Sequence, residues 1–197
     1  MPSRKLDKRT RLLEAASRLV HRQGFNKRTL ADIAAEAEVP LGNIYYYFKT
    51  KEEIGSALIG ERTCSVRNLI EEWNQLPEPR RRVLAFIEMT AASRKSVAQS
   101  GCPVGSLCQE LNKEGGALAG EAAGIFTVVL GWLEEQFRLL GTGKKAADHA
   151  LHLVSALQGV GLLTNAFDDP RLMLREAARL KEWVAAAKQV PQTRAFA

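Results

Sequence analysis

The 197-residue sequence has few of the residues that form disulfide frameworks or metal sites, with three cysteines and three histidines. An odd and small number of cysteines in a chain of this length provides no disulfide framework, so we expect a reducing, cytoplasmic environment. His149 and His152 are three residues apart, and no third ligand is close to them in the sequence. Two histidines alone rarely form a structural metal site, so we expect no metal.

Long apolar runs and alternating polar–apolar runs are also missing. The N-terminus is charged from Arg4 onward and has no apolar core of the kind found in signal peptides. The longest apolar stretch, residues 122–133, is interrupted by Gly and Thr and is too short to span a bilayer, so it predicts a buried helix and no membrane partner. No run has a period of two for long enough to predict a strand. The expected fold class is therefore all-α.

Patterns that indicate catalysis or nucleotide binding do not occur. No spacing suggests a Ser/His/Asp triad, a pair of catalytic carboxylates or a metal hydrolase, and the sequence predicts neither an enzyme nor a cofactor. The glycines between residues 115 and 124 follow no strand and carry no phosphate-loop lysine, so they indicate close packing or a loop. A helical enzyme or ligand carrier without a DNA role remains the alternative from another class, and an absence of salt-sensitive DNA binding would favour it.

The excess of positive charge is confined to one end of the chain. Residues 1–51 contain eleven Lys and Arg against five Asp and Glu, whereas residues 52–197 contain seventeen of each. This asymmetry favours a nucleic-acid partner over a general role in solubility. The basic arm at residues 4–9 either reaches a minor groove and phosphates or is a solvated tail.

Residues 29–54, TLADIAAEAEVPLGNIYYYFKTKEEI, predict two short helices joined by a tight turn, followed by the start of a longer helix. Thr29 is expected to cap the first helix, with Asp32 completing a capping box. Pro40 disfavours an α conformation at Val39 but suits the entry of a new helix.

The second short helix carries Ile44 and Phe48, which are four residues apart and are expected to point into a core. It also carries three consecutive tyrosines at positions 45–47. Successive residues on a helix are about 100° apart, so the three rings cannot share one face and at least one projects outward. A helix that is apolar inside and aromatic outside, with Lys49 and Lys51 beside it, suits insertion into a DNA major groove. The alternative is a helical hairpin with surface tyrosines and no binding role.

The TLADIA opening, the GNIYYYF helix and the FKTKEE junction resemble the DNA-binding segment of the TetR/AcrR family of bacterial transcriptional regulators. The sequence departs from the family at Glu38, where a glycine is usual, at Pro40, where a hydroxyl residue is usual, and at Ala31, where a basic residue is common. The resemblance implies that phosphates are held mainly by Thr29, Tyr46 and Lys51. It implies that base edges or the groove wall are met by Leu41, Gly42, Asn43, Tyr45 and Tyr47.

The resemblance also implies a three-helix head at residues 1–50 and a helical regulatory, ligand-binding and dimerisation body at residues 51–197, about nine helices in total. In the head, Gly24 is expected to end the first helix. The positions of proline and glycine predict body helices at residues 51–74, 80–98, 103–111, 118–140, 144–163 and 170–187. The last of these is expected to start with Asp168 or Asp169 as the cap and Pro170 at the first position. The expected protein is a homodimeric repressor that binds double-stranded DNA at a pseudo-palindromic operator and is released by a small, hydrophobic effector.

The last two predicted helices are apolar on more than one side, so each needs a second surface to pack against. A second copy of the chain is the expected partner, the alternative being a monomeric core. Candidate dimer residues are Leu151, Val154, Leu157, Gly161, Leu172, Leu180 and Trp183.

The effector is expected among the body helices between residues 80 and 140. Its candidate contacts are Phe86, Met89, Cys102, Leu107, Cys108, Phe126 and Trp132. An alternative gating mechanism is chemical modification of Cys102 or Cys108 by an oxidant or electrophile, because a helix N-terminus near Cys102 would raise thiol reactivity. Inert, half-buried cysteines are the plainer interpretation.

Overall fold

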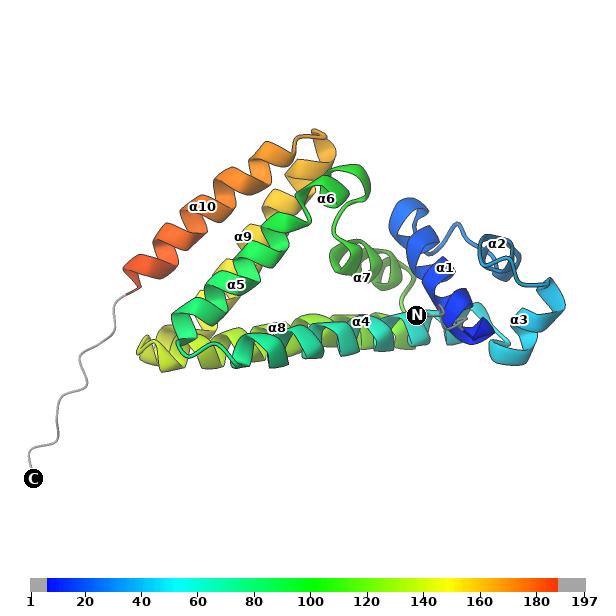
Figure 1. The fold of residues 1–197 in the computed structure, drawn as a ribbon, viewed down its shortest axis with the longest axis horizontal. Coiled ribbons are helices and arrows are strands. Elements are labelled where there is room, and N and C mark those ends of the chain that lie inside the picture. The colour runs from blue at the N-terminus through cyan, green and yellow to red at the C-terminus, as the bar shows by residue number, and fades with distance from the viewer. Residues whose placement is uncertain (1–6, 188–197) are drawn as a thin grey trace, which may run out of the picture. The chain divides into compact units, whose positions relative to one another are not determined.

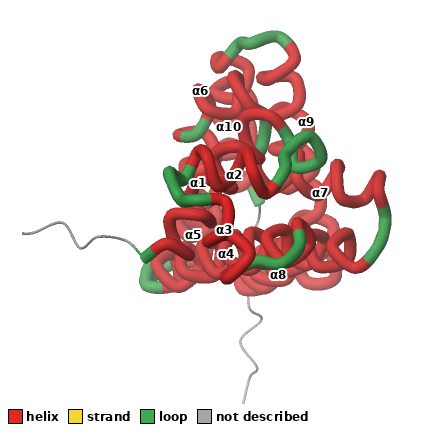
Figure 2. The backbone as a smooth tube through the Cα atoms, turned by 90° about the vertical axis from the view of Figure 1, so that its right-hand side faces the viewer, coloured by secondary structure: helices red, strands yellow, loops and turns green. Residues whose placement is uncertain are grey.

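The computed structural model of the protein describes residues 7–187. These residues form ten α-helices and one 3₁₀ turn, with no strand in that range (Figures 1 and 2). The helices are α1 (Lys8–Gln23), α2 (Leu30–Glu36), α3 (Leu41–Tyr47), α4 (Lys51–Asn74), α5 (Pro79–Ala92), α6 (Arg94–Ser100), α7 (Pro103–Glu114), α8 (Ala117–Leu139), α9 (Ala146–Ala166) and α10 (Pro170–Ala186), with the 3₁₀ turn at Gly143–Lys145. The predicted all-α class is confirmed.

The one predicted helix that differs markedly is residues 80–98, which the structure divides into α5 and α6 at Ser93. The Ser93 hydroxyl donates to the carbonyl oxygen of Thr90 at 2.8 Å, and its backbone N–H also points at the carbonyls of the last turn. A serine that bonds the preceding turn in this way competes with continuation of the helix. Periodicity alone did not predict this break.

Several helix starts follow from capping residues. Asp7 caps α1 by accepting a hydrogen bond from the Thr10 N–H at 2.9 Å. Asp169 caps α10 by accepting from the Arg171 N–H at 2.9 Å, with Pro170 in the first turn, as the sequence predicted. These acceptors satisfy N–H groups that have no partner inside the helix.

The chain forms two compact units, and each combines segments distant in sequence. The first contains residues 7–65 and 102–125, so it includes the head, the start of α4, all of α7 and the start of α8. Helix α7 packs against α1, which is why this unit is larger than the predicted 1–50 head. Its buried core is formed by Leu12, Ala15, Ala16, Leu19, Ile33, Ala34, Ile44, Phe48, Ile54 and Leu58.

The second unit contains residues 66–101 and 126–187. Within it, α10 packs against α5, α6 and α9 (Figure 1). Its buried core is formed by Val83, Ile87, Leu133, Phe137, Leu153, Leu157, Met173, Leu180 and Val184. Beside this core, Trp73, Phe86 and Trp132 form an aromatic cluster with ring centroids 5.3–6.4 Å apart.

Helix α8 contains the apolar stretch that the sequence predicts to be buried. Ala122, Ile125 and Leu133 are buried, but only 22% of the 18-residue window of α8 with the highest hydropathy is buried. By length and composition alone α8 would suffice to cross a bilayer, with a mean hydropathy of 1.4. A single helix of this kind is weak evidence for a membrane segment, because core helices pass the same test. The predicted burial therefore holds for one side of the helix only.

Candidate nucleic-acid interface

The start of α2 is fixed by a complete capping box. The Thr29 hydroxyl accepts from the Asp32 N–H at 3.1 Å, and the Asp32 carboxylate accepts from the Thr29 N–H at 2.8 Å. These bonds hold the pKa of Asp32 below its ordinary value, the backbone bond from Thr29 being the largest cause. The hydroxyl also donates to Asp32 Oδ2 at 2.9 Å. Both donors of Thr29 are thus engaged, and contact with a phosphate would require one of these bonds to be exchanged.

The turn after α2 has the Schellman form in which a left-handed residue ends the helix. The Val39 N–H bonds to the Ala34 carbonyl at 2.9 Å, and the Glu38 N–H bonds to the Ala35 carbonyl at 3.0 Å. Glu38 occupies the left-handed position with φ 52°. Glycine adopts this conformation without strain, whereas a residue with a Cβ does not. Glu38 therefore occupies, with a Cβ, a left-handed position that favours glycine.

Arg11 of α1 stabilises the same turn through hydrogen bonds. Its guanidinium donates to the carbonyl oxygens of Ala37 at 2.6 Å and Glu38 at 3.1 Å. These are the carbonyls at the end of α2, where positive charge is favourable. The angle between α2 and α3 is therefore supported by a charged side chain of α1 as well as by the turn itself.

Helix α3 places one face in the core and the opposite face in solvent. Ile44 and Phe48 are buried, as predicted, whereas Tyr45 is 51% exposed and Tyr46 is 83% exposed. Leu41 at the start of the helix is also largely exposed. Gly42 faces open space, since a Cβ built there meets no atom within 4 Å. Thus Leu41, Gly42, Tyr45 and Tyr46 lie together on an accessible face.

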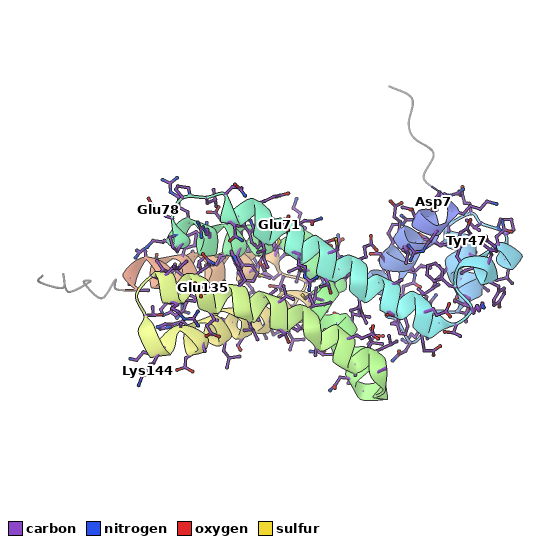
Figure 3. The ribbon with its side chains drawn as sticks, turned by 90° about the horizontal axis from the view of Figure 1, so that it is seen from below. Asp7, Tyr47, Glu71, Glu78, Glu135 and Lys144 are labelled. Atoms are coloured by element: carbon purple, nitrogen blue, oxygen red, sulfur yellow. The ribbon has the colours of Figure 1, made fainter. Side chains whose placement is uncertain are left out.

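Tyr47 differs from its two neighbours. Its side chain, labelled in Figure 3, is half-buried and packs against the core of the first unit. It makes an edge-to-face contact with Tyr46 at 5.0 Å between ring centroids. The Tyr47 ring can therefore hold the exposed Tyr46 ring in place from the core side. Asn43 is half-exposed at the edge of the accessible face, with its backbone N–H bonded to the Pro40 carbonyl.

Lys51, at the first position of α4, is half-buried and is engaged within its own unit. Its ammonium donates to the Asn26 carbonyl at 3.0 Å and lies 4.7 Å from the centre of the Phe25 ring. Two other basic residues lie near the end of α3: Lys49 is exposed, and the exposed Arg9 guanidinium lies 5.4 Å above the Phe48 ring. Arg4 and Lys5 of the basic arm lie outside the described residues.

The seven candidate effector contacts are divided between the two units. Cys102, Leu107 and Cys108 belong to the first, and Phe86, Met89, Phe126 and Trp132 belong to the second. Leu107 is buried, while Met89 is exposed and the other five are half-buried. Trp132 donates to the Asn74 side-chain oxygen at 2.9 Å. The sulfur of Cys102 caps α7 by accepting from the Gly105 N–H, and burial raises the pKa of the Cys108 thiol.

The candidate dimer residues do not share one surface. Val154, Leu157, Gly161 and Leu180 are buried inside their own unit, so in this arrangement they cannot also form the surface that meets a second copy. Leu172 and Trp183 are half-buried, and the Trp183 ring lies between His149 and His152 at 5.3 and 4.9 Å between centroids. Of the seven, only Leu151 is largely exposed.

The exposed apolar side chains of α9, of α10 and of the turn between them are instead Leu151, Leu162, Leu163, Phe167 and Leu174. The last four of these residues are not among the dimer contacts predicted from the sequence. Periodicity shows that a helix has two apolar sides, but it does not show which side packs inside the subunit.

The comparisons with known proteins agree with this geometry. Residues 12–58 match the family model described as "Bacterial regulatory proteins, tetR family". The chain is 31% identical over 110 residues to the HTH-type transcriptional repressor NemR of Escherichia coli, a match that spans 55% of this chain and only about half (54%) of NemR. It is 27% identical over 160 residues to the HTH-type transcriptional regulator LmrA of Bacillus subtilis, covering 80% of this chain and 85% of LmrA.

Solved structures of similar fold cover most of the chain. A TetR transcriptional regulator from Legionella pneumophila has a TM-score of 0.84 at 17% identity, covering 92% of this chain and 99% of that one. The reduced form of E. coli NemR has a TM-score of 0.76 at 22% identity, covering 89% and 96%. The relatives with assigned roles are transcriptional regulators and not enzymes. Residues 12–58 thus match the TetR family of bacterial regulatory proteins, and most of the chain has the fold of solved TetR-family regulators.

Proposed function

We propose that this protein is a homodimeric transcriptional repressor that binds a pseudo-palindromic DNA operator and is released by a small hydrophobic effector. The observation that carries the proposal is the outward face of α3, where Leu41, Tyr45 and Tyr46 are exposed although the opposite face is buried. A contiguous patch of exposed large side chains on a small domain indicates an interaction surface. A helix of this kind beside basic residues is suited to a major groove.

We assign the contact roles by motif position and by the exposure of each side chain. Tyr45 and Leu41 meet bases or the groove wall, Asn43 bonds adenine in two places, and Tyr46 holds a phosphate. Exposed Lys49 and Arg9 add positive charge next to this face. Thr29 and Lys51 join the phosphate contacts only if they exchange the internal hydrogen bonds described above.

The size of the reading surface supports the proposed dimer. A seven-residue helix contacts few base pairs, and two such helices spaced about 34–36 Å apart read two half-sites of one duplex. The exposed apolar side chains Leu151, Leu162, Phe167 and Leu174 lie on α9, α10 and the turn that joins them. We assign the dimer interface to these residues, since a twofold contact buries the same patch on both copies.

The effector is proposed to contact the half-buried apolar side chains of the body, among them Phe86, Phe126 and Trp132. Binding releases DNA only to the extent that the effector has a higher affinity for the conformation that does not fit the operator. A mostly apolar lining suits a hydrophobic molecule.

A second candidate mechanism is gating by cysteine chemistry. The relative NemR has been solved in a reduced form, and this chain has Cys102 as the cap of α7 and Cys108 within that helix. The raised pKa of Cys108 opposes thiolate formation, so Cys102 is the stronger candidate. Replacing each cysteine with serine tests this mechanism: a retained response to oxidant or electrophile excludes it.

The decisive experiment for the main proposal is fluorescence anisotropy with labelled duplexes at about 50 and 200 mM salt. One duplex carries the region upstream of the protein's own gene, and the other has a random sequence. We expect tighter binding to the upstream region, with affinity for both falling steeply as salt rises. Absence of salt-sensitive binding to either duplex would contradict the proposal and favour a carrier or enzyme.

A further inference from the structure

The loop between α1 and α2 is held by charged side chains from two other helices. The backbone N–H of Asn26 donates to the Glu110 carboxylate of α7 at 3.2 Å. The backbone carbonyl of the same residue accepts from the Lys51 ammonium of α4 at 3.0 Å. All of these groups lie in the first compact unit. Both polar backbone groups of Asn26 are therefore bonded to side chains distant in sequence.

Gly24 gives the Glu110 carboxylate access to this loop. Its φ of +83° favours glycine, and a Cβ built there would lie 2.7 and 2.8 Å from the two carboxylate oxygens. Any larger residue would therefore displace Glu110 as well as strain the backbone. The glycine serves two purposes, ending α1 and admitting the carboxylate.

Phe25, which lies between Gly24 and Asn26 in the sequence, holds the loop through apolar contacts. It is buried, and Gly55 of α4 lies against it so closely that a Cβ there would be 3.0 Å from the Phe25 ring and 2.8 Å from Leu118 of α8. Ser56 also donates to Glu121 of α8 at 2.7 Å. Three successive residues, 24 to 26, are thus in contact with α4, α7 or both.

The Glu110 contact has opposing electrostatic effects on stability. A carboxylate beside the C-terminal end of α1 faces the negative end of the helix dipole, which is unfavourable. Its bond to the Asn26 N–H offsets part of this cost, so the net effect on stability is small. The bond nevertheless determines where the loop lies, and Thr29, which caps α2, follows three residues later.

We propose that Glu110 is a positioning residue for DNA binding: it ties the loop that leads into α2 and α3 to α7. Displacement of α7 would move this loop and with it the reading helix. Helix α7 and its cap carry Cys102, Leu107 and Cys108, which are candidate effector contacts, so an effector or a modification there would act on DNA binding through Glu110. This inference rests on the proposed function.

The test uses the full chain with three substitutions. Glu110→Ala removes the acceptor, Glu110→Gln keeps an acceptor oxygen at the same reach, and Gln109→Ala changes the exposed neighbour on the same helix. Hydrogen exchange of the free protein is measured for amides 24–36, and anisotropy gives affinity for the upstream duplex at several salt concentrations.

We expect Glu110→Ala to speed exchange of amides 24–29 by about tenfold, since a hydrogen bond to a charged group is lost. Operator affinity should fall about five- to tenfold with an unchanged salt slope, because no phosphate contact is removed. Glu110→Gln should retain most of both properties, and Gln109→Ala should match the parent protein.

Unchanged exchange and unchanged affinity in Glu110→Ala would overturn the inference. So would a loss of protection spread evenly over the first unit in both Glu110 variants, because Glu110 would then only stabilise the fold. A weaker dependence of DNA affinity on salt in Glu110→Ala would indicate instead that Glu110 acts on the phosphate contacts. If the parent protein binds no DNA, the proposed function fails, whereas the exchange measurement still decides whether Glu110 holds the loop.

Discussion

At the scale of single residues, Lys51 illustrates how a motif position can acquire a second role. The family resemblance implies a phosphate contact, but in this chain the ammonium bonds the Asn26 carbonyl and lies over the Phe25 ring. The sequence has Lys51 shortly after the tyrosine-rich helix, and in the structure it is the first residue of α4. The sequence could not predict the internal bond, because Asn26 and Lys51 are 25 residues apart.

Lys51→Ala is therefore expected to lower the free energy of unfolding by about 1 kcal/mol, through the lost bond to Asn26. If Lys51 also contacts a phosphate in the complex, the salt slope should flatten by about 0.9. Thermal denaturation and salt-dependent anisotropy measure the two effects separately. Lys49→Ala is the matched control for charge, and a slope equal to that of the parent protein would remove Lys51 from the phosphate contacts.

Glu38 has a strained backbone that glycine would relieve. Its φ of 52° costs a residue with a Cβ about 1–2 kcal/mol. Glycine loses more chain entropy on folding, about 0.5–1 kcal/mol, so Glu38→Gly should stabilise the protein by about 0.5–1 kcal/mol. The ion pair with Arg11 is exposed and adds little. Chemical denaturation checks the change, and Glu38→Ala, which keeps the Cβ, should show no such gain.

Asp32 links stability to pH. Its pKa is lowered in the folded protein, chiefly by the Thr29 backbone bond, so folding favours the ionised carboxylate. This contribution is fully present above the ordinary carboxyl pKa and is lost as the pH falls through the folded value. The parent protein should lose stability between about pH 5 and pH 3. Asp32→Asn should lose less over that interval, and an identical pH profile would contradict a role for the capping box.

At the scale of elements, most helix ends could be predicted from local chemistry. Thr29, Asp169 and Gly24 mark helix boundaries that the structure contains, because capping is a contact between near neighbours in the chain. Burial patterns depend on distant partners and were predicted less well. Ile44 and Phe48 were correctly assigned to the core of the head, whereas Val154 and Leu157 were assigned to a dimer surface although they pack inside their own subunit.

Helix α3 offers a matched pair of substitutions. Tyr46 is 83% exposed and Tyr47 is half-buried against the core. Tyr46→Ala should weaken operator binding by about 1–2 kcal/mol while leaving the melting temperature unchanged. Tyr47→Ala should instead lower the free energy of unfolding by about 1–3 kcal/mol, less than for a fully buried aromatic.

Anisotropy and thermal denaturation of both variants provide the measurement for α3. The two tyrosines are adjacent in sequence, so a shared loss of stability would show that α3 packs differently from the arrangement described here. Full operator affinity in Tyr46→Ala would remove the most exposed ring from the interface.

At the scale of the whole molecule, the proposed operator binding depends on pairing of two chains. The exposed side chains Leu162 and Phe167 lie on the surface that we assign to the partner. Leu162 is 63% exposed, and Leu139, on α8 of the same unit, is 53% exposed. This pair allows a test in which two leucines of similar exposure are changed in the same way.

Leu162→Glu should convert the dimer to a monomer in light scattering and lower operator affinity at least tenfold, since charges across a twofold axis face one another. Leu139→Glu should leave both the mass and the affinity unchanged. A dimer that survives Leu162→Glu, or that is lost in Leu139→Glu, would place the interface elsewhere on the chain.

The open space at Gly42 has a consequence for how such a protein can acquire new targets. Because no atom of the free protein lies within 4 Å of a Cβ built there, a longer side chain enters α3 without repacking the domain. A single substitution at this position could therefore change which DNA sequences the protein recognises, at almost no cost to folding. A library of substitutions at position 42 only, selected for binding to altered half-sites, would yield variants with new DNA specificity.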